Sequence, residues 1–122
     1  MIELTLEKAI ELIRECVRER GENYVYSNPT RGSANCENWH TTATVDEPGC
    51  IIGLAMFKFV GPAVKNYPVG VSTILLDELE IQATPTVLHF LWAVQSAQDE
   101  KTPWGEAFKG GLLALKFGHT HH

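Results

Sequence analysis

The stretch DEPGCIIGLAMFKFVG, residues 46–61, decides how this chain folds. A Pro-Gly turn precedes an almost wholly apolar run and a Gly-Pro pair closes it, which is typical of a helix with defined ends. Lys58 is the single charged residue of the run, so we predict a helix over residues 49–60 that is buried nearly all round. Gly53 costs up to about 1 kcal/mol relative to alanine inside a helix. We therefore predict that another backbone segment packs closely against it.

Helical patterns flank this segment on both sides. Residues 5–20 repeat apolar side chains every three or four positions, and two Thr-Pro pairs place a capping residue before a proline, as at helix starts. Residues 72–79 are predicted to form a short helix, although the apolar run Ile74–Leu76 leaves a strand open. The helices predicted around the central one span residues 5–20, 72–79, 85–100 and 103–116.

Residues 23–46 differ in composition from the rest of the chain. Tyr24–Tyr26 and Thr41–Val45 are rich in aromatic and β-branched residues, which favour strands. The segment between them is rich in Asn, Ser, Gly and Pro, which favour loops. The predicted fold class is therefore α+β and mostly helical, with four to five helices packed around helix 49–60 and a small antiparallel hairpin at about residues 23–46.

Length and charge set the broad class of protein. The chain has 122 residues, and we expect one globular domain over residues 1–117 followed by a histidine-rich tail, 118–122, that is either native or tag-derived. The formal net charge is −5. Because nucleic-acid binders neutralise phosphates with a basic face, nucleic acid is not an expected partner, and a local patch of Arg18, Arg20 and Arg31 is the alternative.

The expected compartment follows from the cysteines and the apolar runs. Three cysteines without a paired CxxC spacing are typical of a reducing compartment. The charged N-terminal segment lacks the apolar core of a signal peptide. The longest apolar run, residues 50–57, is far shorter than the roughly 20 residues that cross a membrane. We expect a cytoplasmic protein with no membrane partner.

Cys50 is the first candidate for chemistry. It lies at the predicted N-terminus of helix 49–60, where exposed N–H groups and the helix dipole favour a thiolate. A thiol-dependent hydrolase would need His40 or His89 as its base. No motif of a known cysteine hydrolase surrounds Cys50, so the favoured interpretation is a packed cysteine and an enzyme is not expected.

Cys36, His40 and Cys50 are candidate metal ligands, with the spacing C-x₃-H-x₉-C. A structural zinc site normally has four ligands in short paired spacings. Here the fourth would have to come from Asp46, His89 or the tail. The favoured interpretation is a polar loop that contains a Cys and a His, and no metal or cofactor is expected.

The predicted helix 85–100 carries a candidate binding surface. His89, Trp92 and Ser96 are three and four residues apart, so they share one helix face. Tryptophan gives a large contact area at low entropic cost, as binding surfaces require. The alternative is that Trp92 fills the core. Arg31 and Trp39 are further candidates for binding.

Three short motifs suggest a relationship. The order YVY at 24–26, PGCIIG at 48–53 and QSAQDEKTPWGEA at 95–107 resembles small proteins of unassigned function encoded by actinobacterial tailed phages. The resemblance covers most of residues 23–107. It implies a phage origin and action inside an infected bacterium, and it brings no catalytic residues.

These observations lead to one expected function and two alternatives. The expected function is that of a non-enzymatic phage accessory protein, which acts by binding a host protein or by self-association and so can counter a host defence. The first alternative is the Cys50 hydrolase. The second is a sponge that sequesters a signalling nucleotide in an oligomer pocket lined by Arg31, Trp39 and Trp92.

Overall fold

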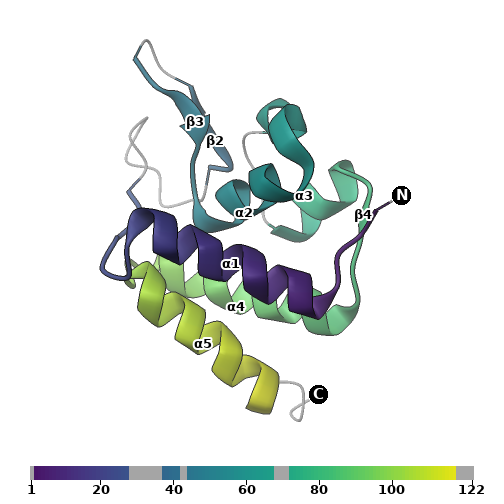
Figure 1. Ribbon diagram of the computed structural model, residues 1–122, viewed down its shortest axis with the longest axis vertical. Coiled ribbons are helices and arrows are strands. Elements are labelled where there is room, and N and C mark those ends of the chain that lie inside the picture. The colour runs from purple at the N-terminus through teal and green to yellow at the C-terminus, as the bar shows by residue number, and fades with distance from the viewer. Residues whose placement is uncertain (1, 28–36, 42–43, 68–71, 118–122) are drawn as a thin grey trace.

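Figure 1 shows the computed structural model of the chain, which describes residues 2–27, 37–41, 44–67 and 72–117. The α+β, mostly helical fold class is confirmed. The elements in chain order are β1 (Ile2–Glu3), α1 (Leu6–Arg20), β2 (Trp39–Thr41), β3 (Asp46–Pro48), α2 (Ile51–Val60), the 3₁₀-helix η1 (Gly61–Asn66), α3 (Ser72–Glu78), β4 (Ile81–Gln82), α4 (Pro85–Asp99) and α5 (Trp104–Phe117). Each predicted helix is present, with ends within about two residues of those expected, which is the usual uncertainty of helix boundaries.

The predicted antiparallel hairpin is present, but its strands are β2 and β3, with Trp39 opposite Pro48 and Thr41 opposite Asp46. Tyr24–Tyr26 form no strand. The Tyr24 carbonyl instead accepts a hydrogen bond of 2.8 Å from the amide of Trp104 at the start of α5. The Tyr24 ring packs edge to face on Trp104 of α5, while the Tyr26 ring stacks on His40 of β2. Strand propensity is therefore overridden by tertiary context.

A second small sheet was not predicted. β1 and β4 pair in parallel, with Ile2 opposite Ile81, and the Leu4 amide donates to the Gln82 carbonyl at 2.8 Å. Figure 1 shows the N-terminus running alongside β4 beyond the ends of the helices. Strands this short carry no sequence periodicity, so only the folded arrangement reveals the pair.

Helix α2 lies at the centre of the fold, where it packs against α1, α4 and β3. Its residues Ile51–Met56 are buried on every face, and its last turn, Phe57–Val60, is half-buried. The prediction of a helix buried nearly all round is confirmed for the first six residues. The close approach predicted at Gly53 is also confirmed, because an added Cβ would lie 2.2 Å from the backbone oxygen of Asn38.

The N-terminus of α2 is held by residues distant in sequence. The Cys50 amide donates to the Glu37 carbonyl at 2.8 Å, and the Ile51 amide donates to Oε1 of the fully buried Gln98 of α4 at 2.8 Å. The Cys50 side chain makes no capping hydrogen bond. Since the first amides of a helix have no partner within it, these two contacts tie α2 to the 37–38 segment and to α4.

The buried thiol of Cys16 in α1 should make the stability of the fold depend on pH in the alkaline range. Its side chain is fully buried, and burial raises the pKa of the thiol from 9.0 to about 12. The unfolded chain therefore loses this proton at lower pH than the folded chain does, so the free energy of unfolding falls between about pH 9 and pH 12. Burial likewise raises the pKa of Tyr26 from 10.0 to about 12, which adds to the fall above about pH 10.

The check is urea unfolding of the wild-type chain and Cys16→Ala between about pH 8 and pH 11. We expect the variant to lose less stability over this range than the wild type, because only Tyr26 still contributes. Parallel pH profiles for the two chains would show that the buried thiol does not cause the alkaline loss.

Candidate functional site

The candidate binding surface is the outer face of α4. Trp92 is 56 % exposed, and its ring stacks on the imidazole of His89 with centroids 6.1 Å apart and an interplanar angle of 24°. Ser96 lies on the same side of the helix, one turn beyond Trp92, and both Ser96 and His89 are half-buried. The structure therefore brings these three predicted residues onto one face, and Trp92 does not fill the core.

The orientation of α4 explains why this face is open to solvent. The opposite side of the helix is buried against the core through Val87, Phe90, Leu91, Val94 and Gln98. Pro85 occupies the first helical position, and the Thr84 hydroxyl accepts a hydrogen bond from the Val87 amide. A fixed helix start and a buried stripe together determine which side chains point outward.

Trp39 belongs to a separate cluster at the hairpin. Its side chain is only 7 % exposed, and its Nε1 donates to Asp46 Oδ1 at 2.7 Å. Lys65 lies over the ring at 5.9 Å and its Nζ is 2.9 Å from Asp46 Oδ2. The indole also contacts Phe57 of α2 edge to face. These contacts account for Trp39 as a packing residue, while Arg31 lies outside the described residues.

His40 of β2 is buried and belongs to a polar network at the hairpin. Its Nδ1 is 2.8 Å from Glu37 Oε1, and its Nε2 is 3.1 Å from the Tyr26 hydroxyl. A carboxylate only accepts hydrogen bonds, so Nδ1 donates to Glu37, and Nε2 lies within hydrogen-bond distance of the Tyr26 hydroxyl. The Tyr26 oxygen in turn accepts from the Glu37 amide at 3.1 Å. Both imidazole nitrogens are therefore occupied, which suits a structural role.

Cys50 is fully buried and disulfide-bonded, whereas Cys16 is a free cysteine. The expectation of a thiol at Cys50 is therefore wrong, and a disulfide departs from the cysteine chemistry typical of a reducing compartment. Its Sγ lies 3.6 Å from Asn38 Oδ1, and because a disulfide sulfur carries no proton this is a contact without a hydrogen bond. Cys36 lies outside the described residues. A sulfur in a disulfide has no thiolate with which to attack a substrate.

This disulfide gives a direct prediction. Thiol labelling of the unfolded, unreduced chain should modify one of its three cysteines, and prior reduction should expose all three. Reduction should lower the free energy of unfolding by about 2–4 kcal/mol, the usual contribution of a disulfide. Labelling of three thiols without reduction, or an unchanged unfolding midpoint after reduction, would contradict the prediction.

The metal hypothesis gains no support from the described residues. Within residues 2–27, 37–41, 44–67 and 72–117, no group of three or more His, Cys, Asp or Glu side chains is placed to hold an ion. His40 uses both of its ring nitrogens in other contacts. Asp46 instead pairs with Trp39 and Lys65, and these hydrogen bonds lower the pKa of its carboxyl group.

One surface feature was missed by the sequence analysis. Arg14 and Arg18 of α1 line a cleft that also includes Phe108 of α5. Glu11, one turn before Arg14 on α1, is paired with Lys8 at 3.3 Å. The approach of α1 to α5 has no local sequence signal, so this cleft could not be predicted.

Comparisons with family models, with curated proteins and with solved structures find no match to this chain. None of the helices in the part of the chain that the structure describes is long and apolar enough to cross a membrane.

Proposed function

We propose that this chain is a non-enzymatic accessory protein, of the phage type that its sequence resembles, and that it binds another protein through the outer face of α4. The observation that carries the proposal is the exposure of Trp92, which is 56 % accessible and stacked on His89. Burying an aromatic side chain of this size contributes strongly to association, and tryptophan is enriched among the residues that dominate binding energy.

The stacked imidazole adds to the case for Trp92. A ring held against a neighbour loses less conformational freedom on binding than a freely rotating one, which lowers the entropic cost of association. His89 and Ser96 place polar groups beside the indole, as is usual around the apolar centre of an interface. The proposed partner is a host protein. Self-association through the same face of α4 is the second form that this binding can take.

The hydrolase alternative is less well supported. Cys50 is disulfide-bonded and fully buried, and both ring nitrogens of His40 are engaged by Glu37 and Tyr26. His89 lies on the outer face of α4, stacked on Trp92. The sponge alternative takes Arg31, Trp39 and Trp92 as candidates to line an oligomer pocket, but Trp39 is buried at the hairpin with Asp46 and offers little surface to a ligand.

The test compares Trp92→Ala with Leu113→Ala in affinity capture from an actinobacterial lysate and in the solution mass of the purified chain. Leu113 is 57 % exposed on α5 and is a matched control for loss of exposed apolar surface. We expect Trp92→Ala to weaken retention of the partner, or self-association, by more than about tenfold. Leu113→Ala should bind as the wild type does.

Both substitutions replace exposed side chains, so each should change the free energy of unfolding by no more than about 0.5 kcal/mol. If Trp92→Ala retains the same proteins and has the same solution mass as the wild type, the outer face of α4 is not the binding surface. Equal losses in both variants would show that the association depends on general surface apolarity.

A further inference from the structure

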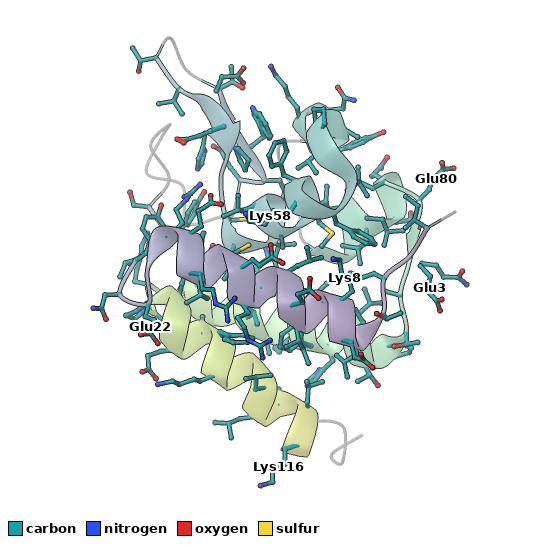
Figure 2. All side chains as sticks on the ribbon, in the orientation of Figure 1. Glu3, Lys8, Glu22, Lys58, Glu80 and Lys116 are labelled. Carbon is teal, nitrogen blue, oxygen red and sulfur yellow. The ribbon has the colours of Figure 1, made fainter. Side chains whose placement is uncertain are left out.

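The cleft between α1 and α5 is the second place where the surface could hold a ligand. Its volume is about 530 Å³, within the range of about 300–1,000 Å³ that small-molecule sites occupy. The lining residues are Arg14, Val17, Arg18, Gly21, Glu22 and Phe108. Figure 2 shows Glu22 at the C-terminal end of α1, at the opposite end of the helix from Lys8.

The two arginines of the cleft have no ion-pair partner within the described parts of the chain. They are one helical turn apart, so both guanidinium groups can reach the same anionic group of a ligand. Arg14 lies over the Phe108 ring at 5.7 Å. The chain as a whole carries a formal charge of −5, so these two arginines form a positively charged spot on a protein whose net charge is negative.

The helix dipole favours a positive charge at only one of these two arginine positions. Arg18 lies in the last turn of α1, where a positive charge complements the carbonyl end of a helix. Arg14 lies one turn earlier, and the dipole effect falls off within the last turn. Arg14 is instead positioned by its contact with Phe108, which also lines the cleft.

The other lining residues of the cleft include two apolar side chains, a glycine and one carboxylate. Val17 is buried and Phe108 half-buried, so together they offer a surface on which a ring can stack or pack. Gly21 has open space where a side chain would be. Glu22 is exposed, and its carboxylate repels a second anionic group while accepting hydrogen bonds from a hydroxyl or amine.

We propose that this cleft binds an aromatic phosphate monoester, with the phosphate held by Arg14 and Arg18 and the ring placed against Phe108 and Val17. Two planar guanidinium groups supply paired N–H donors that match phosphate oxygens. The two guanidinium groups together neutralise the charge of a phosphate dianion. This site is separate from the α4 face and goes beyond the proposed function.

The experiment is calorimetric titration with phenyl phosphate at low salt, together with backbone NMR shifts that locate the site. We expect Arg14→Gln and Arg18→Gln each to weaken binding about tenfold, the loss typical of one charge-assisted hydrogen bond. Lys8→Gln is the control, because it removes the same charge from α1 at a site paired with Glu11, and it should leave the affinity unchanged.

Three further probes separate the parts of the ligand. Inorganic phosphate and benzoate should each bind at least about tenfold more weakly than phenyl phosphate, and phenol should not bind measurably. Equal affinity of phenyl phosphate for the wild type and both arginine variants would overturn the proposal. Equal loss in Lys8→Gln, or shift changes outside the cleft, would also overturn it, because binding would then reflect general charge or another site.

Discussion

Gly53→Ala should destabilise the fold by about 3 kcal/mol, at the upper end of what overpacking usually costs. An added Cβ would lie 2.2 Å from the Asn38 backbone oxygen and 2.6 Å from its Cα. Asn38 cannot easily move away, because its carbonyl accepts the Gly49 amide at 3.0 Å and its Nδ2 donates to the Tyr67 carbonyl at 3.0 Å. Either α2 or the 37–38 segment must shift, and both Asn38 and the first six residues of α2 are buried.

Gly110→Ala is the matched control on α5. No atom outside its own helix neighbourhood lies within 4 Å of an added Cβ there, so alanine should stabilise the helix by about 0.5–1 kcal/mol. Urea unfolding of the two variants should therefore give midpoints on opposite sides of the wild type. A Gly53→Ala chain as stable as the wild type would show that Asn38 does not pack against α2 as described.

Gln98→Leu should cost about 2 kcal/mol, because it leaves a buried amide without a partner. The Gln98 Oε1 accepts the Ile51 amide at 2.8 Å across a separation of 47 residues, and the side chain is fully buried. Leucine has a similar size and no acceptor, so the loss comes from the unsatisfied Ile51 N–H at the start of α2.

Gln82→Leu controls for the change in side-chain polarity, because Gln82 is exposed on β4. Its stability should stay within about 0.5 kcal/mol of the wild type. In Gln98→Leu, amide hydrogen exchange should also accelerate in the first turn of α2 more than in α5. Unchanged exchange at Ile51 together with an unchanged unfolding midpoint would show that the α2 terminus does not depend on Gln98.

Local signals in the sequence predicted the helices well. Thr5 accepts a hydrogen bond from the Lys8 amide, as a capping residue should, and Thr84 with Pro85 marks the start of α4. The apolar run of α2 predicted its burial, and Gly53 predicted the close contact. These features depend on residues near one another in the chain, and so they can be read without the fold.

Long-range features could not be predicted in the same way. Tyr24–Tyr26 have strand composition, but their place beside α5 depends on how the chain returns to Trp104. The partner of the α2 terminus, Gln98, gives no local sign of its role. Polar side chains that cap distant elements have no fixed spacing, so only the folded structure reveals them.

The candidate site was partly predictable. Helical spacing placed His89, Trp92 and Ser96 on one face, and the structure places them so. Whether that face was buried or open was not decidable from spacing, because it depends on which elements cover α4. The cleft with Arg14 and Phe108 joins two helices and has no motif, so neither residue stood out before the fold was known.

Photo-crosslinking at position 92 reports whether a binding partner lies on the outer face of α4. A photoreactive phenylalanine analogue replaces Trp92 in one chain and Leu113 in another, since both positions are more than half exposed. We expect a covalent adduct with one protein partner, or with a second copy of this chain, from position 92 and none from position 113. No adduct from position 92, or equal adducts from both positions, would contradict binding through this face.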